Sequence, residues 1–203
     1  MTHRADLLVR AALVLALTLT LSSCLGQNEV EEHFYSLTGP RMASEKGNGP
    51  RLLVSELGAA PGYDSQRLAY RVSPNELRYY LHRQWIAEPP RMLAEMLVRH
   101  LKVSGRFSQV ARSEKLRDPD AVLDGTIDAI EEVDLPDGWQ ARLAMSFQLR
   151  KPDTEQVLVR HSFDVSMPCA KRHPAEVAKT VSEIFAREVE RLARKLGEAL
   201  AHR

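Results

Sequence analysis

Trp139-Gln-Ala-Arg-Leu-Ala-Met-Ser-Phe-Gln-Leu-Arg150 decides the fold, because its apolar and polar residues alternate almost without a break. A period of two is typical of a β-strand with one buried and one solvated face. Segments 121–133 and 156–167 alternate in the same way, and turn residues at 136–138 and 151–153 separate the three segments. The pattern predicts three consecutive antiparallel strands. In the first of them, the residues expected to share the inward face are Leu123, Gly125, Ile127, Ala129 and Val133.

Two other segments have the 3.6-residue period of amphipathic helices. Pro89-Pro90 opens a helix expected over 90–104, which Gly105 ends. Pro174 opens a second helix, expected to run to about Leu200. Two amphipathic helices and a sheet with one apolar face bury those surfaces by packing together. The sequence therefore predicts an α+β fold, a two-layer sandwich of an antiparallel sheet with both helices on one face.

Shorter strands are expected earlier in the chain. Segments 33–37 and 51–57 are strand candidates, and Gly58 to Gly62 is interpreted as a turn. Segments 68–72 and 77–82 are expected to form a hairpin around Ser73-Pro74-Asn75-Glu76.

The N-terminus is typical of a secretion signal. Arg4 and Arg10 precede the uncharged run 11–21, which is shorter than the roughly 20 apolar residues of a membrane span. Leu21-Ser22-Ser23-Cys24 then resembles the bacterial lipobox. This order predicts a lipoprotein signal peptide over 1–23, lipidation of Cys24, a tether over 24–32, and a folded domain over 33–203. An uncleaved anchor, or an ordinary signal peptide with a chance cysteine, is the alternative.

Lipidation of Cys24 would leave the second cysteine, Cys169, without a partner in the chain. The fold is therefore expected to rely on its hydrophobic core, with Cys169 a small structural residue near a strand end. Acyl chains on Cys24 would hold the protein at a membrane.

Composition and motifs argue against several functions. The chain has 28 Lys and Arg and 27 Asp and Glu residues, so no basic excess indicates nucleic-acid binding. No nucleophile elbow, zinc-protease motif, paired Cys-x-x-Cys or phosphate-binding loop is present. His82, His100 and His161 lie on different predicted elements. We expect no catalytic residues, no metal site and no cofactor.

Tyr79, Tyr80 and Trp85 form an aromatic group just before the first predicted helix. These rings could fill a corner where strand meets helix, or they could form a partner-contact surface, since Tyr and Trp are enriched at interfaces.

The same region carries a family resemblance. Leu68-Ala-Tyr-Arg-Val72, Leu77-Arg-Tyr-Tyr80, Trp85-Ile-Ala-Glu-Pro-Pro90 and Ser104-Gly105-Arg106-Phe107 resemble the ABC-type transport auxiliary lipoprotein family. Gln84 departs from the arginine that commonly precedes the family's Trp, although Arg83 is adjacent. The resemblance implies an antiparallel sheet with two helices and no catalytic residues.

The resemblance also implies partners. These would be an MCE-type substrate-binding protein and an inner-membrane ABC permease and ATPase, in a system that moves lipids across the envelope. Leu25, rather than Asp, follows Cys24, which by the common sorting convention favours the outer membrane. The alternative functions are a structural or outer-membrane assembly lipoprotein without a transporter, and a periplasmic enzyme.

Overall fold

The structure is a computed structural model that describes residues 30–41, 47–112 and 116–201. The predicted signal peptide and Cys24 lie outside these residues. Every element belongs to the unit Glu32–Arg203. In chain order, the elements are β1 (His33–Tyr35), β2 (Arg51–Val54), β3 (Gly58–Ala59), β4 (Arg67–Ser73), β5 (Glu76–Trp85), α2 (Pro89–Val103), β6 (Gln109–Arg112), β7 (Ala121–Leu135), β8 (Gly138–Arg150), β9 (Val157–Pro168) and α3 (Pro174–Ala201).

Strand β7 is the central strand of a nine-stranded sheet. One of its edges pairs antiparallel with β8, and β8 pairs antiparallel with β9, as the alternating segments predicted. The other edge of β7 pairs in turn with β2, β3 and β4, all of them parallel to it. Strand β6 extends the sheet beyond β2, while β5 and then β1 extend it beyond β4.

The sheet is therefore mixed, and the prediction of an antiparallel sheet holds only for its long strands and the β4–β5 hairpin. The chain passes along one edge of β7 from β2 to β3 to β4, so these three strands must share a direction. That shared direction is parallel to β7. The periodicity of isolated short strands carries no information about this direction.

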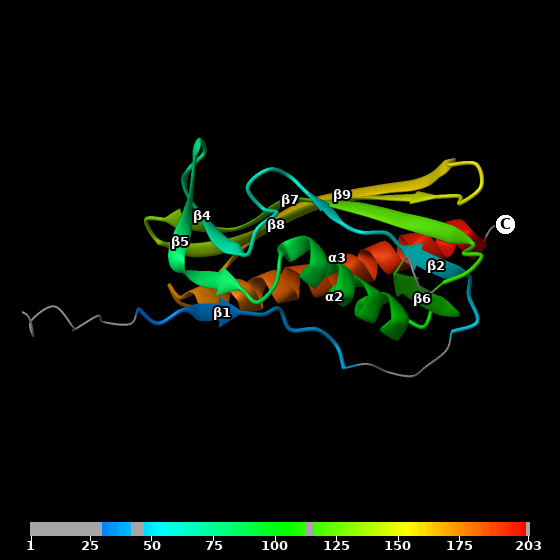
Figure 1. The fold of residues 1–203 in the computed structure, drawn as a ribbon, viewed down its shortest axis with the longest axis horizontal. Coiled ribbons are helices and arrows are strands. Elements are labelled where there is room, and N and C mark those ends of the chain that lie inside the picture. Colours follow the sequence, from blue (N-terminus) through cyan, green and yellow to red (C-terminus); the bar gives the residue numbers. More distant parts are fainter. Residues whose placement is uncertain (1–29, 42–46, 113–115, 202–203) are drawn as a thin grey trace, which may run out of the picture. The chain divides into compact units, whose positions relative to one another are not determined.

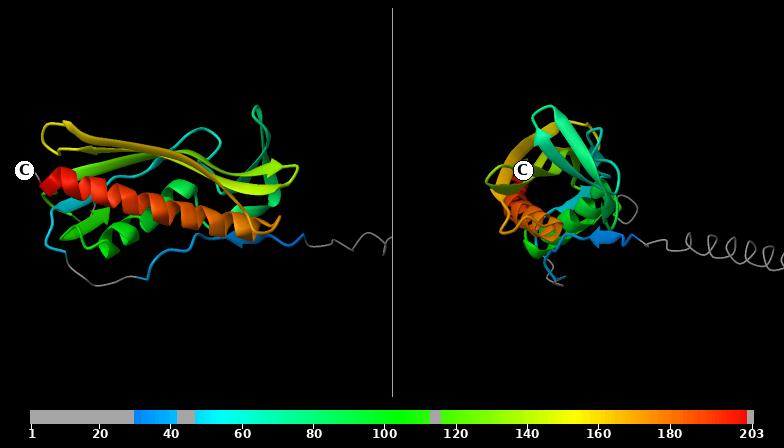
Figure 2. Two further views of the ribbon diagram at one scale, coloured as in Figure 1. Left: turned by 180° about the vertical axis from the view of Figure 1, so that it is seen from behind. Right: turned by 90° about the vertical axis from the view of Figure 1, so that its left-hand side faces the viewer.

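Both helices lie on one face of the sheet, which confirms the two-layer α+β prediction (Figure 1). Seen end-on, the sheet curves around the two helices (Figure 2). Helix α2 has prolines in its first turn and ends at Val103, with Ser104 as its C-cap. The next residue, Gly105, adopts a φ of +65° that favours glycine. Both helix ranges agree with the predicted ones to within one residue.

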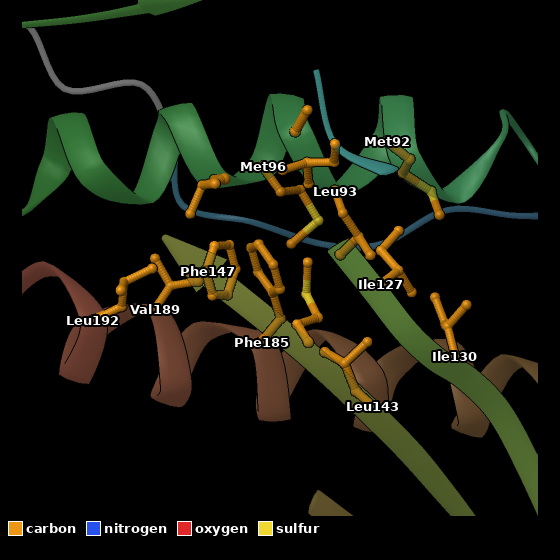
Figure 3. Close-up of a cluster of buried hydrophobic side chains, with 14 of the residues drawn as sticks. Met92, Leu93, Met96, Ile127, Ile130, Leu143, Phe147, Phe185, Val189 and Leu192 are labelled. Atoms are coloured by element: carbon orange, nitrogen blue, oxygen red, sulfur yellow. The ribbon is translucent and has the colours of Figure 1, made fainter. Parts of the chain in front are cut away.

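The core lies between the sheet and the helices (Figure 3). Leu143 and Met145 of β8 are fully buried, and Phe185 of α3 extends into the same cluster of buried side chains as Leu143. Helix α2 closes the other side with side chains that include Leu93 and Leu97, both with no exposed surface. Each such side chain contributes about 1.5–3 kcal/mol through burial, so this layer dominates the stability of the fold.

A β-bulge in β7 changes which residues face the core. Ile127 pairs with Met145 and Ala129 pairs with Ala144, so one extra residue, Asp128, lies between these pairs. The bulge reverses the alternation. Ile130 and Glu132 therefore face the helices, opposite Leu143 and Ala141. The prediction that Ala129 and Val133 share the inward face of Leu123 is wrong, because they pair with Ala144 and Gln140 on the other face.

Two short strands were not predicted. Gly58 and Ala59, interpreted as part of a turn, form β3 before the chain turns at residues 61–62. Strand β6 follows α2 and pairs with β2. Both strands are too short to show a period of two. Cys169 does lie immediately after a strand, β9, and is half-buried.

Candidate functional site

The β4–β5 hairpin carries the aromatic residues that the sequence singled out. Ser73 pairs with Glu76 across the turn at Pro74-Asn75, as predicted. Strand β4 pairs with β7 only at residues 69–71, so the tip of the hairpin extends past the rest of the sheet (Figure 1). Two register shifts between β4 and β5 allow the hairpin to bend.

Trp85 lies in the core. Its side chain is 1% exposed, and its backbone N–H donates to the carbonyl oxygen of Gln66. For this residue the structural alternative of the sequence analysis therefore holds, because a fully buried ring offers no surface to a partner.

Tyr79 and Tyr80 are half-buried and lie on the bent part of the hairpin. The Tyr79 hydroxyl donates to the carbonyl oxygen of Gly62 over 3.1 Å, and the Arg67 guanidinium lies 4.0 Å from the centre of the Tyr79 ring. The Tyr80 ring lies 4.7 Å from the Tyr70 ring. The Tyr79 hydroxyl and the Tyr80 ring therefore make contacts that hold the hairpin in place. Part of each ring remains exposed to solvent.

Leu81, next to these tyrosines, is the most exposed large apolar residue in the described chain. Its side chain is 84% exposed, and Phe34 of the neighbouring strand β1 is 54% exposed. The sequence analysis missed Leu81, since an apolar residue in a strand gives no sign of facing solvent when the strand bends.

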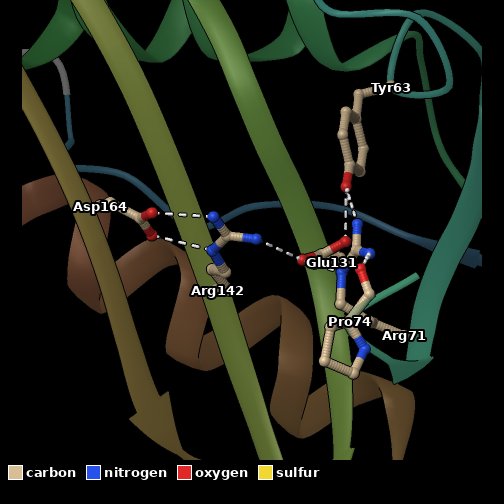
Figure 4. A network of polar contacts seen from close by, with 6 residues as sticks. All are labelled: Tyr63, Arg71, Pro74, Glu131, Arg142 and Asp164. Atoms are coloured by element: carbon tan, nitrogen blue, oxygen red, sulfur yellow. Dashed lines mark hydrogen bonds and ion pairs between the residues drawn. The ribbon is translucent and has the colours of Figure 1, made fainter. Parts of the chain in front are cut away.

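An ionic network around the buried carboxylate of Glu131 connects the hairpin to the outer face of the sheet (Figure 4). Arg71 Nε donates to Glu131 Oε1 over 2.8 Å, and Arg142 donates to the same oxygen over 2.9 Å. Arg142 also forms two bonds of 2.8 Å to Asp164, and Tyr63 donates its hydroxyl proton to Glu131. The network joins the hairpin to β7, β8 and β9.

These contacts set the charges of the network. Burial by itself would raise the pKa of Glu131, but hydrogen bonds from Arg71, Tyr63 and Arg142 lower the pKa below its usual range. Burial and the bond to Glu131 raise the pKa of Tyr63 to about 12. Glu131 is therefore an ionised carboxylate held between two arginines, and not a proton donor.

The adjacent Glu132 faces the helices and has a different environment. It is 1% exposed, and its two oxygens accept a hydrogen bond from the Tyr80 hydroxyl over 2.9 and 3.1 Å. Burial raises the pKa of Glu132 to about 7, although the Tyr80 bond opposes this shift.

The sequence analysis missed both glutamates, although a signal was present. Alternate residues of a strand face opposite sides, so two consecutive acidic residues within a strand that is buried on one face must place one of them inward. Glu131-Glu132, two adjacent acidic residues inside the alternating segment 121–133, fits this description.

One group of polar residues in the described part of the chain brings serine, histidine and aspartate near one another without forming a relay. Ser162, Ser146 and Asp124 line a hollow of about 430 Å³ to which His161 also belongs. The side chain of His161 faces the helices, however, with Nδ1 3.1 Å from Lys195 Nζ, whereas Ser162 is on the opposite face. No serine–histidine–aspartate relay can form across the sheet.

Within the described residues, no group of three His, Cys, Asp or Glu side chains could hold a metal ion. His82 contacts Glu32, His100 packs against Phe185, and His161 contacts Lys195, so the histidines stay on separate elements, as expected. Neither α2 nor α3 combines the length and the apolar character of a membrane-crossing helix.

The match to a family model decides the relationship. Residues 35–193, which include the hairpin, the long strands and most of α3, match the model described as the ABC-type transport auxiliary lipoprotein component. The chain belongs to this family. The family's description makes the protein an auxiliary lipoprotein component of ABC-type transport, and a lipoprotein is membrane-anchored in the cell envelope. No curated protein matches the chain.

Solved structures share the fold of the auxiliary lipoprotein. Protein XCC0632 from Xanthomonas campestris is 22% identical, with a TM-score of 0.69 over 85% of this chain and 95% of that one. A second structure, described as an uncharacterized protein, is 20% identical, with a TM-score of 0.67 over 82% of this chain and 99% of that one. These similarities establish the fold and no function beyond it.

Proposed function

We propose that the protein is a non-catalytic auxiliary subunit of an MCE-associated ABC transport system that moves lipids across the envelope. The observation that carries the proposal is the family match over residues 35–193, which spans almost the whole folded unit. The distribution of polar groups supports a docking role rather than catalysis, because the buried carboxylates are engaged by arginine or tyrosine.

The N-terminus would supply the anchor. Diacylglyceryl and acyl chains on Cys24 hold a protein at a membrane stably, because two or more chains are needed for firm anchoring. A fully extended chain spans about 3.3–3.6 Å per residue, so the segment from Cys24 to His33 can reach about 30 Å from the membrane. Leu25 after the cysteine favours the outer membrane.

The hairpin would supply the partner contact. Tyr79 and Tyr80 each present part of a ring, and Leu81, which follows them on β5, is 84% exposed. Exposed aromatic and aliphatic side chains on a projecting hairpin are suited to insertion into a pocket of another protein. The proposed partners are an MCE-type substrate-binding protein and the ABC permease with its ATPase.

The test is affinity capture of the full-length protein from detergent-solubilised envelopes after in-cell crosslinking. Recovery of an MCE protein or an ABC permease is the expected result. Recovery of an outer-membrane barrel or peptidoglycan instead would establish the alternative, an assembly lipoprotein without a transporter. A parallel Cys24→Ser variant should lose both palmitate labelling and its place in the membrane fraction.

The contact residues are tested separately. Leu81→Ser should reduce crosslinking to the partner about tenfold. Val103→Ser is the matched control, because Val103 is an exposed apolar residue on α2, outside the hairpin. Equal crosslinking by both variants would exclude the hairpin as the docking element while leaving the transport role open.

A further inference from the structure

Strand β9 forms a long edge of the sheet that faces away from the hairpin. Within the described residues, β9 pairs with β8 alone over Val157–Pro168. Such an edge is a template for another strand, and proteins usually interrupt it with proline, bulges or inward-pointing charges. Residues 159–167 contain no proline and keep a regular register with β8.

The direction of each backbone group of β9 follows from one hydrogen bond. The Cys169 N–H donates to the carbonyl oxygen of Trp139 over 2.8 Å, so the odd-numbered residues of β9 bond to β8. In an antiparallel ladder the alternate residues point the other way. Arg160, Ser162, Asp164 and Ser166 therefore direct their N–H and C=O groups to the free edge. Pro168, which has no N–H, occupies an edge-facing position, where proline is tolerated.

A group of cations on α3, called here the basic rim, lies under this edge (Figure 2 shows α3 along β9). The basic rim consists of Arg187, Arg191 and Lys195. Arg187 contacts the Met167 sulfur at 3.4 Å, and Lys195 lies 3.1 Å from His161 Nδ1. Burial and Lys195 lower the pKa of His161, so this ring adds no charge.

The two arginines of the basic rim share one carboxylate as their ion-pair partner. Glu188, which is 2% exposed, accepts bonds of 2.9 and 3.1 Å from Arg191 and lies 3.4 Å from Arg187. On the other face of β9, Asp164 is held by Arg142, and Arg160 is exposed. The edge thus combines unpaired backbone groups with a net positive charge.

We propose that β9 is a docking edge for an extended acidic segment of another protein, which adds to the sheet as a further strand. Main-chain hydrogen bonds would provide the pairing, and acidic side chains on the helix side would contact the basic rim. A second copy paired through the same edge would bring two basic rims together, so like charges oppose that occupant. The proposal stands whether or not the partner belongs to a transporter.

The test uses the full-length protein in detergent and two fluorescein-labelled peptides of eight residues. One peptide is a Thr-Glu repeat and the other a Thr-Lys repeat, and both favour extended chains. Fluorescence anisotropy should show binding of the acidic peptide and at least tenfold weaker binding of the basic one. Equal affinity for the two peptides, or no binding of the acidic one, would overturn the proposal.

Two variants separate backbone pairing from charge. Ser162→Pro removes an edge-facing N–H that β8 does not use, and it should weaken binding at least about fivefold, whereas Ser162→Ala should not. Arg191→Gln with Lys195→Gln should weaken binding by a similar factor, whereas Lys179→Gln near the start of α3 should not. Undiminished binding by Ser162→Pro would reduce the interaction to simple charge attraction and contradict strand addition.

Hydrogen exchange at single amides tests strand addition in the wild-type protein, without any substitution. The N–H groups of Ser162 and Asp164 should exchange fast in the free protein and slow at least tenfold on addition of the acidic peptide. Those of His161 and Phe163 should be slow throughout. If the Ser162 amide is already slow without peptide and the protein is a dimer, the edge is occupied by a second copy and the proposal is wrong.

Discussion

At the scale of single residues, two consecutive glutamates have opposite electrostatic roles. Glu131 is compensated by two arginines, whereas Glu132 has only a tyrosine hydroxyl as its direct hydrogen-bond partner. Their pKa values shift in opposite directions for this reason. The two residues should therefore respond to pH and to substitution in opposite ways.

Replacement of Glu132 by glutamine should stabilise the protein at alkaline pH. The raised pKa means that the folded state holds this proton more tightly than the unfolded chain, so the wild type loses stability as the pH rises from about 4.5 to about 7. Glu132→Gln removes that loss and keeps an acceptor for Tyr80. Urea unfolding should show a gain of about 2–3 kcal/mol at pH 8 and almost none at pH 4.5. A gain that is the same at both pH values would contradict this account.

Replacement of Glu131 by glutamine should destabilise the protein at neutral pH. The lowered pKa of Glu131 stabilises the fold above the unfolded-state pKa near 4.5, and this contribution is lost as the pH falls. Glu131→Gln leaves Arg71 and Arg142 without their shared carboxylate, at a cost of about 3 kcal/mol. The unfolding free energy at pH 7 measures this cost. A variant as stable as the wild type would show that Asp164 alone compensates the arginines.

At the scale of elements, the long segments could be predicted from sequence and the short ones could not. Strands β7, β8 and β9 and both helices are long enough for several repeats of their periods. Strands β3 and β6 are not, and their places depend on pairing with strands distant in sequence. The bulge at Asp128 depends on the register with β8 and leaves no local signal.

The candidate site was predictable to a smaller extent. Sequence singled out the hairpin and its tyrosines, because aromatic residues beside a turn are conspicuous. It could not distinguish buried Trp85 from exposed Leu81, since burial is set by how the strand bends. The Glu131–Glu132 pair could have been found from its position within a strand that is buried on one face.

Gly49, just before β2, packs tightly against the backbone of Arg106 in the segment after α2. A Cβ atom on Gly49 would overlap the carbonyl oxygen of Arg106, so Gly49→Ala requires the backbone to move. We expect a loss of about 2 kcal/mol or more in unfolding free energy. Gly138→Ala is the matched control: no atom lies within 4 Å of its added Cβ, and it should change stability by less than about 0.5 kcal/mol. Equal effects of the two substitutions would mean that the contact at Gly49 relaxes freely.

At the scale of the whole molecule, one core joins the sheet to both helices. Phe185 of α3 is fully buried and contacts His100 of α2 edge-to-face, with the ring centres 5.7 Å apart. Burial lowers the pKa of His100, so the ring stays neutral within this contact. Loss of the aromatic side chain would thus affect all the layers together.

Phe185→Ala should therefore destabilise the folded unit as a whole. Large-to-small substitutions of buried aromatic residues cost about 3–5 kcal/mol, and the unfolding transition should remain single. Phe34→Ala, at a site 54% exposed, should cost less than about 1 kcal/mol. Thermal unfolding followed by circular dichroism tests both, and separate transitions for helices and sheet would refute the single core.

The extra residue at position 128 makes this strand tolerant of chemical change and of the loss of that residue. Asp128 is exposed, so most side chains should be accepted there at little cost. Deletion of the residue would place Ala129 directly after Ile127, and the pairs Ile127–Met145 and Ala129–Ala144 would become consecutive pairs of a regular ladder. Every residue from Ala129 onward would keep its face, so the carboxylate of Glu131 would still reach both arginines and Ile130 would stay out of water. A gene that drops this one codon should therefore yield a soluble product whose strand is straighter at this point, and an insoluble product would contradict the pairing of β7 with β8.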